Sequence, residues 1–236
     1  MNNFYYIYLI FIILLLSYFI IKIYSFNKDI IFLHIPKNAG TSFKIMYPEI
    51  QHKNHANSFP NSNYINIAIV RNPYTRFQSI FQHIFKRSNL NGNHQPAWDL
   101  KNIKTLDDFV DAYYDPKNKN YKKVRNLLNW NKNKIQKYKY FINNGGCPKI
   151  NNYGCIHWAP QYLFINDASK IDYLIKFENF NTEINKLQLM GILNKKKIIK
   201  KNQSKDIHKS LSPKAIKLVN EIYAKDFYLW NIAGIN

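Results

Sequence analysis

Cysteine is scarce in this chain of 236 residues, which contains only Cys147 and Cys155. A metal site built on two thiolates needs further ligands, and no pattern in the sequence supplies them. We therefore expect no metal centre. A small disulfide-closed loop in an oxidising compartment and two free thiols are both consistent with this pair of cysteines.

Acidic residues are also few: Asp and Glu number 14 against 34 Lys and Arg, which gives a formal net charge of +20. Such a balance favours anionic partners, among them nucleic acid and anionic membranes. Lys, Asn and Ile are abundant throughout the chain, however, as a coding bias would produce, and lysine runs are typical of solvated surface. We therefore expect no nucleic-acid partner.

Internal repeats and domain linkers are absent from the sequence, and its length and 46% hydrophobic content fit one domain with a full core. Short apolar strands that each run into a helix predict an α/β fold, a P-loop-like three-layer domain whose central parallel sheet is flanked by helices. Further helices are expected over Leu106–Tyr114, over Tyr121–Trp130 and from Ser212-Pro213 to Trp230.

The first strand, from Ile30 to Leu33, leads into a turn and a helix start. The residues that follow are Pro36, Lys37, Asn38, Ala39, Gly40, Thr41 and Ser42. Gly40 permits a tight turn, and Thr41 and Ser42 place hydroxyls beside the amides of the helix start. With the Lys37 ammonium and the helix dipole, these groups predict a binding site for one phosphate-like anion.

A second strand, residues 65–70, also runs into a helix, with Asn72 as N-cap and Pro73 at the first helical position. Apolar residues at helical spacing form one face, so the polar residues Arg76, Ser79 and His83 share the opposite face. The apolar residues are Phe77, Ile80, Phe81, Ile84 and Phe85. We expect Arg71, at the strand end, and Ser79, two turns into the helix, to bind a second anion.

Two anion sites at the carboxyl ends of two strands suggest a ligand with two separated phosphates, bound where open α/β sheets bind ligands. In these two motifs the chain resembles the sulfotransferases. In that family the first motif holds the 5′-phosphosulfate of PAPS (3′-phosphoadenosine 5′-phosphosulfate), and an Arg and a Ser eight residues apart hold the 3′-phosphate. Arg71 and Ser79 have the same spacing. The resemblance implies that residues 36–42, Arg71 and Ser79 bind PAPS.

Three later segments are similar to the membrane-anchored carbohydrate sulfotransferases in particular. They are His157-Trp158-Ala159-Pro160-Gln161, the strand end Phe177-Glu178-Asn179 and the terminal Tyr223-Ala224-Lys225-Asp226-Phe227, with a weaker match at Asn202-Gln203-Ser204. The resemblance implies that the chain is an enzyme that transfers a sulfuryl group from PAPS to a hydroxyl of a carbohydrate acceptor.

Sulfuryl transfer needs an acceptor hydroxyl in line with the leaving phosphate oxygen, stabilisation of negative charge and a base for the hydroxyl proton. Lys37 is the candidate for charge stabilisation. A neutral histidine suits the base. His55 is the first choice, because its segment looks like the base-bearing segment of related enzymes. His52 is the base if that segment is shifted in register, and a solvated loop histidine is the structural alternative.

Other titratable groups receive lesser roles. Glu178 is a weaker candidate base, for which we favour a buried structural role. The resemblance places His34 where it orients the first turn, and His157 is expected to be structural or to contact the acceptor.

Two other functions stay open from the sequence. A P-loop kinase is disfavoured because a nucleoside-triphosphate loop needs Lys directly after its last Gly, whereas Lys37 precedes Gly40. The sequence also offers no convincing acidic motif for Mg²⁺. The other alternative is a catalytically inactive, membrane-tethered basic binding protein.

The N-terminal segment from Phe4 to Ile21 is uncharged and mostly apolar. As a helix it would span about 27 Å, close to the hydrocarbon core of a bilayer. Since the start carries no side-chain charge and no small-residue cleavage site follows, we expect a transmembrane signal anchor over residues 4–21 and not a cleaved signal peptide. A short stem, residues 22–29, would then precede a sulfotransferase domain over residues 30–236.

The orientation of this anchor has conflicting indications. Lys22 and Lys28 follow it, and the positive-inside rule would keep that flank cytoplasmic. The family resemblance implies a type II protein with its catalytic domain in the Golgi lumen, and we follow the resemblance.

Overall fold

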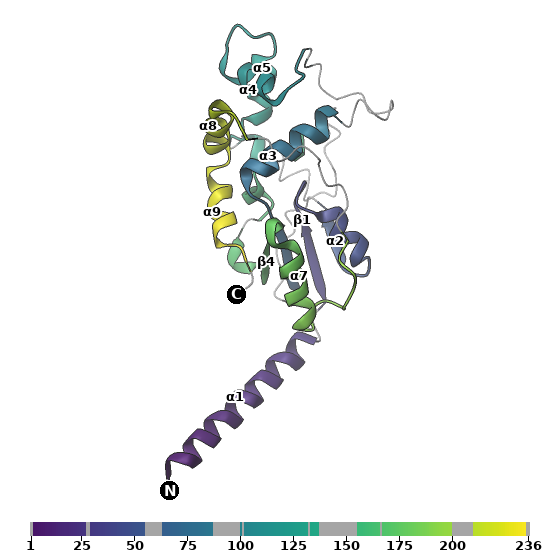
Figure 1. Ribbon diagram of the computed structural model, residues 1–236, viewed down its shortest axis with the longest axis vertical. Coiled ribbons are helices and arrows are strands. Elements are labelled where there is room, and N and C mark those ends of the chain that lie inside the picture. Colours follow the sequence, from purple (N-terminus) through teal and green to yellow (C-terminus); the bar gives the residue numbers. More distant parts are fainter. Residues whose placement is uncertain are drawn as a thin grey trace.

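The computed structural model describes residues 2–26, 29–54, 63–86, 100, 102–131, 133–136, 155–165, 167–199 and 210–234 (Figure 1). The strands are β1 (Ile30–His34), β2 (Gln51–Asn54), β3 (Ile65–Val70) and β4 (Tyr173–Lys176). The α-helices are α1 (Asn2–Phe26), α2 (Gly40–Met46), α3 (Pro73–Phe81), α4 (Leu106–Tyr114), α5 (Tyr121–Leu128), α7 (Phe180–Leu189), α8 (Pro213–Ile222) and α9 (Ala224–Ile232). A π-helical turn, η1 (Gln82–Lys86), extends α3, and the 3₁₀ helices are η2 (Cys155–Trp158), η3 (Gln161–Leu163), η4 (Ala168–Lys170) and η5 (Phe177–Asn179).

The described strands form one parallel sheet in the order β2-β1-β3-β4, which confirms the predicted α/β architecture. Ile31 of β1 pairs with Gln51 of β2, and Phe32 pairs with Ile67 of β3. All six residues of β3 are buried, as expected for an interior strand covered on both faces.

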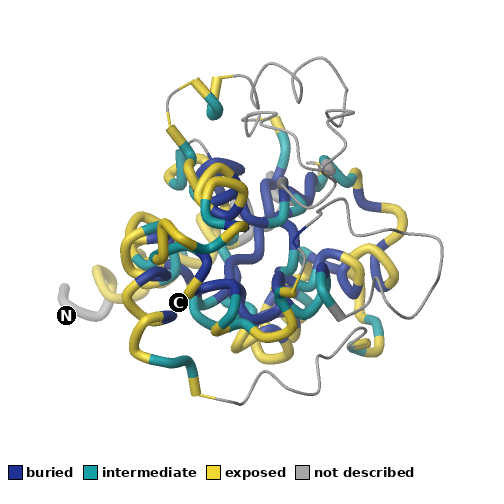
Figure 2. Tube along the Cα trace, turned by 90° about the horizontal axis from the view of Figure 1, so that it is seen from above, coloured by how far each residue is buried: buried dark blue, intermediate teal, exposed yellow. Residues whose placement is uncertain are grey.

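Alternate residues of the strands supply two different cores. Phe32, Ile67 and Ile69 pack with α2 and α7 on one face of the sheet. Leu33, Ala68 and Val70 pack on the other face with residues of η2, η3 and α9. This alternation follows from the two-residue period of a strand and produces three layers (Figures 1 and 2).

A third core lies around α3, α4, α5 and α8. Trp158 stacks on Phe109 of α4 with ring centroids 4.8 Å apart and contacts Phe77 of α3 edge-on at 5.3 Å. Both faces of α3 are therefore inside the protein, and the side chains of Arg76, Gln78 and Ser79 are buried with its apolar residues.

Several predicted boundaries are confirmed. The α3 N-terminus has Asn72 as a cap that accepts a hydrogen bond from Tyr74 N–H, with Pro73 directly after it. The expected C-terminal helix is divided in two at Tyr223, whose hydroxyl donates to the carbonyl of Trp158 (2.9 Å) and fixes the chain there. The strand β2 was not expected.

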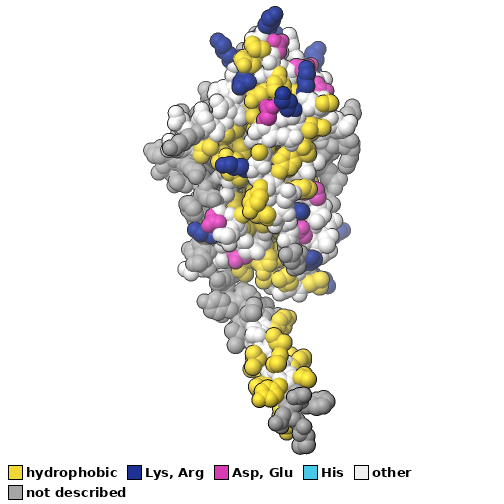
Figure 3. All heavy atoms as spheres, turned by 90° about the vertical axis from the view of Figure 1, so that its left-hand side faces the viewer, with side chains coloured by type: hydrophobic (Ala, Val, Ile, Leu, Met, Phe, Trp, Pro, Cys, Tyr) yellow, Lys and Arg dark blue, Asp and Glu magenta, His cyan; other side chains and the backbone are white. Residues whose placement is uncertain are grey.

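The N-terminal segment is helical, but the prediction of a transmembrane anchor is wrong. Within the described residues, no helix has the length and apolar character needed to cross a bilayer. The prediction of a single-pass type II protein in the Golgi membrane depended on that anchor and is wrong for the same reason. The described α1 side chains are largely exposed, and the helix extends away from the sheet (Figures 1 and 3).

Candidate active site

At the carboxyl ends of β1 and β3 the chain reverses the direction in which it adds strands to the sheet. From β1 the chain passes through α2 to β2 on one side, whereas from β3 it continues to β4 on the other side. Since the two connections diverge, a crevice is expected between these strand ends, which is where open α/β sheets bind ligands. The loop at residues 35–39 follows β1, and Arg71 follows β3, so the fold brings both predicted anion motifs to this place.

The loop after β1 has an unusual backbone. Lys37 and Ala39 have positive φ angles of 70° and 60°, which non-glycine residues adopt at a cost of about 1 kcal/mol or more each. Two arginines bind its carbonyls: Arg76 Nε donates to Pro36 O (3.2 Å), and Arg71 Nη1 donates to Lys37 O (3.2 Å). The loop is therefore held in this conformation by contacts from the β3–α3 segment.

These carbonyl contacts also set the direction of the loop amides. In a trans peptide the C=O and the following N–H point in opposite directions. The N–H groups of Lys37 and Asn38 therefore point away from the two guanidinium groups. Successive amides that point the same way in a turn can form an anion-binding concavity.

Gly40 serves close packing and not the turn itself, which corrects the expectation from sequence. It opens α2, and the positive φ angles lie at Lys37 and Ala39 instead. A Cβ placed on Gly40 would overlap the imidazole ring of His34. The next two residues differ in burial, since Thr41 is exposed at the first turn of α2 and Ser42 is buried.

Arg71 is almost fully buried at the end of β3. Its Nε donates to Thr75 Oγ1 (3.1 Å), and its guanidinium carbon lies 4.2 Å from the centre of the Phe177 ring. Burial lowers the pKa of Arg71 to about 10, with the Glu178 charge acting in the opposite direction, so the group stays positive at neutral pH.

Thr75 is a site residue that sequence reasoning missed. It lies four residues from Arg71 and four from Ser79, so Thr75 and Ser79 share a face of α3. Ser79 is buried on that face, and within the described chain no hydrogen bond joins it to Arg71. The spacing of four residues was the signal that could have identified Thr75.

Gln161 connects the two motifs. Its Oε1 accepts hydrogen bonds from Asn38 Nδ2 (2.6 Å) and Arg71 N (2.9 Å), and its Nε2 donates to Arg71 O (2.8 Å). Asn38 Nδ2 also donates to Ile69 O (2.8 Å). The Pro-Gln segment thereby ties the loop after β1 to the end of β3.

Asp226 in turn fixes Gln161. Its carboxylate accepts the amides of Gln161 (2.8 Å) and Tyr162 (3.0 Å) at the start of η3. Burial raises the pKa of Asp226 to about 6, although the Arg76 charge and these hydrogen bonds act to lower it. The terminal Tyr-x-x-Asp-Phe segment and the Pro-Gln segment are therefore one connected structure.

Comparison with known proteins gives the family. A family model described as "Sulfotransferase family" matches residues 23–232, which is most of the chain. The protein belongs to the sulfotransferase family. Searches of curated proteins and of solved structures returned no match. Family membership supports sulfuryl transfer as the general chemistry, in place of the phosphoryl transfer of the P-loop kinase considered from the sequence.

In this sulfotransferase, Arg76, which the sequence placed on the polar face of α3, lies inside the protein. It is 1% exposed, and besides Pro36 its guanidinium reaches the carbonyl of His157 through Nη2 (3.1 Å). Arg76 therefore links the anion loop to the His-Trp-Ala-Pro-Gln segment. The imidazole of His157 lies 5.0 Å from that of His83, centre to centre.

Of the two candidate bases, the structure describes His52 but not His55. His52 lies within β2, where its ring packs edge-on against Phe32 (5.5 Å between ring centres) and its Nε2 is 3.1 Å from the Tyr47 carbonyl. His55 lies outside the described residues and follows Asn54, the last residue of β2, in the sequence.

The remaining sequence predictions divide as follows. Glu178 has the structural role that we favoured, but it is exposed and not buried: it accepts hydrogen bonds from Asn72 N (2.9 Å) and Trp230 Nε1 (2.9 Å). Cys147 and the Asn202-Gln203-Ser204 segment lie outside the described residues, as does the side chain of Cys155. The state of the two cysteines stays a prediction.

Proposed function

We propose that this sulfotransferase transfers a sulfuryl group from PAPS to a hydroxyl group of a carbohydrate. The observation that carries the proposal is the contact between the two motifs at the sheet edge, where Arg71 from β3 binds the carbonyl of Lys37 in the loop after β1. Two cationic positions at adjoining strand ends suit a donor with two separated anionic groups. The carbohydrate acceptor rests on the resemblance of the later segments.

In this proposal the loop binds the 5′-phosphosulfate through its backbone amides and the Lys37 ammonium. The residues concerned are Pro36, Lys37, Asn38, Ala39, Gly40, Thr41 and Ser42. Arg71 and Ser79, with Thr75 between them on α3, bind the 3′-phosphate. Because Arg71 also holds the loop, the two phosphate sites depend on each other.

The chemical step needs charge stabilisation and a base. The acceptor oxygen bonds to sulfur while the bond from sulfur to the phosphate oxygen breaks, and that oxygen keeps the electron pair. Lys37 stabilises the negative charge that develops there. His55 accepts the hydroxyl proton, and His52 is the second candidate. Since a carbonyl only accepts hydrogen bonds, His52 Nε2 donates to Tyr47, and a neutral ring then carries its lone pair on Nδ1, so this contact does not decide between the two histidines.

The test is transfer of labelled sulfate from PAPS to a panel of oligosaccharides. Lys37→Ala should lower turnover by about a hundredfold or more, the usual cost of losing such a stabilising donor. Lys44→Ala removes the same charge from an exposed position on α2 and is the matched control. Equal rates for the two variants would contradict the role of Lys37, and an active nucleotide site without transfer to any saccharide would favour the non-catalytic alternative.

A further inference from the structure

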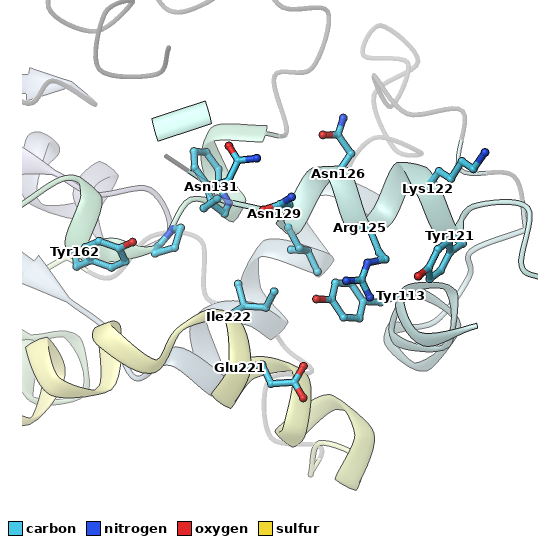
Figure 4. Close-up of a pocket in the computed structure, with 13 residues that line it drawn as sticks. Tyr113, Tyr121, Lys122, Arg125, Asn126, Asn129, Asn131, Tyr162, Glu221 and Ile222 are labelled. Carbon is cyan, nitrogen blue, oxygen red and sulfur yellow. The ribbon is translucent and has the colours of Figure 1, made fainter. Parts of the chain in front are cut away.

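A cavity lies between α4, α5 and the end of α8. Its volume is about 610 Å³, within the usual range for pockets that hold small organic ligands. Four aromatic residues line it: Tyr113, Tyr121, Trp130 and Tyr162. Figure 4 shows Arg125 extending from α5 toward Tyr113, with Glu221 and Ile222 of α8 across from them.

The aromatic and amide lining suits a sugar ring. Pyranose rings have apolar C–H faces, which pack on aromatic side chains, and a rim of hydroxyls that needs hydrogen-bonding groups. Asn126, Asn129 and Asn131 supply amide groups in the same lining, beside the tyrosine hydroxyls. Asn131 Oδ1 already accepts from Lys134 N (2.9 Å), which fixes that side chain in the lining.

Positive charge surrounds this cavity. Lys122 and Arg125 belong to its lining, and two more ammonium groups lie over its rings, Lys134 at 4.5 Å from Trp130 and Lys225 at 5.1 Å from Tyr162. Glu221 is the acidic residue of the lining, and it already accepts Tyr114 Oη (3.2 Å) and lies 4.0 Å from Lys217. Figure 3 shows Lys and Arg side chains at this end of the molecule, with Asp and Glu side chains among them.

Arg125 is the residue best placed to bind an anion. Its guanidinium carbon is 4.8 Å from the Tyr113 ring centre and 5.5 Å from that of Tyr121. Stacking of this kind uses the planar face of the guanidinium, and its N–H edge is the part that pairs with carboxylate or sulfate.

The cavity shares a wall with the candidate active site. Pro160 and Tyr162 line it, and Gln161 between them binds Asn38 and the backbone of Arg71. We propose that this cavity binds an anionic sugar unit of the acceptor, one that carries a carboxylate or sulfate and does not itself react. That the bound sugar belongs to the acceptor rests on the proposed function, whereas binding of an anionic sugar in this cavity can be tested independently.

The test is calorimetric titration of the full chain with a sulfated tetrasaccharide derived from heparin, with neutral chitotetraose as comparison. Arg125→Gln should weaken binding of the sulfated probe by about tenfold or more, because a charge-assisted hydrogen bond is lost. Lys123→Gln removes a charge from the same helix outside the lining and should change binding by less than about twofold.

Two results would overturn the inference: equal losses in Arg125→Gln and Lys123→Gln, or chitotetraose binding as tightly as the sulfated probe. Adenosine 3′,5′-bisphosphate titrated into the same preparations separates this inference from the proposed function. If the bisphosphate binds and the saccharide does not, the cavity assignment alone is wrong; if the saccharide binds as expected and the bisphosphate does not, the PAPS assignment alone is wrong.

Discussion

Two arginines on the β3–α3 segment hold the loop after β1 by its carbonyls, and this arrangement explains how a loop with two strained residues keeps its shape. A buried guanidinium costs free energy unless its donors are used, and Arg76 satisfies donors with carbonyls from two distant segments. Arg71 donates to the Lys37 carbonyl and to the Thr75 hydroxyl, beside the proposed 3′-phosphate site. Each arginine therefore has a structural contact that sequence spacing could not reveal.

Arg71→Ala should weaken binding of adenosine 3′,5′-bisphosphate by about tenfold or more, because a charge-assisted contact to phosphate is lost. Adenosine 5′-phosphate, which lacks the 3′-phosphate, should lose less affinity. Calorimetric titration of wild type and variant with both nucleotides measures the difference. Equal losses for the two nucleotides would mean that Arg71 acts through the loop alone and not on the 3′-phosphate.

Gly40→Ala should destabilise the fold by about 2 kcal/mol or more, because the new methyl group overlaps the His34 ring. A second substitution, His34→Ala, removes that ring, so the double variant should recover much of the loss that Gly40→Ala causes alone. Urea unfolding of the single and double variants measures the coupling. Strictly additive effects would show that contact with His34 is not the reason for glycine at this position.

The helices and strands that sequence analysis found are those whose signals are local. The apolar runs of β1 and β3 and the Asn72-Pro73 start of α3 need no knowledge of the rest of the chain. By contrast, β2 consists of Gln51, His52, Lys53 and Asn54, and it pairs with β1 alone in the described sheet. An edge strand this short and polar has no apolar pattern to identify it.

Local sequence signals also leave out contacts that α3 and the C-terminal helices make with distant parts of the chain. Helical periodicity assigned Arg76 and Ser79 to the face opposite the apolar one, which is correct, but periodicity does not say whether that face meets solvent or a second core. That face is buried here, because Arg76 contacts the carbonyls of Pro36 and His157. The break at Tyr223 arises from a contact with Trp158, which lies far away in the sequence.

Asp226 joins α9 to η3 and should make stability depend on pH. Its pKa is raised from 3.8 to about 6 in the fold, so the folded chain binds this proton more tightly than the unfolded chain. The stability it contributes is present below about pH 4 and is lost as pH rises to about 6. The advantage of wild type over Asp226→Asn should therefore shrink by about 2 kcal/mol between pH 4 and pH 6.5.

Urea unfolding at both pH values measures that change, and Asp111→Asn, at an exposed position on α4, is the control for the general effect of removing a carboxylate. An advantage of wild type over Asp226→Asn that is the same at both pH values would contradict the raised pKa of Asp226.

In the whole molecule, the candidate active site lies where the connections from β1 to β2 and from β3 to β4 diverge. The two anion motifs are separated by about thirty residues of sequence, and only the strand order β2-β1-β3-β4 brings them to one edge. Order along the chain and family resemblance were enough to pair them, whereas the cavity between α4, α5 and α8 has no sequence signature, because its lining comes from four separate segments. The net charge of +20 fits anionic ligands at both places.

The central claim is that the crevice binds a nucleotide with two separated phosphates, and calorimetric titration of the full chain with adenosine 3′,5′-bisphosphate, with ATP as comparison, tests it most directly. We predict that the bisphosphate binds at least about tenfold more tightly than ATP, since only the bisphosphate can engage both the loop and the Arg71 position. Preference for ATP, or no binding of either nucleotide, would contradict the claim.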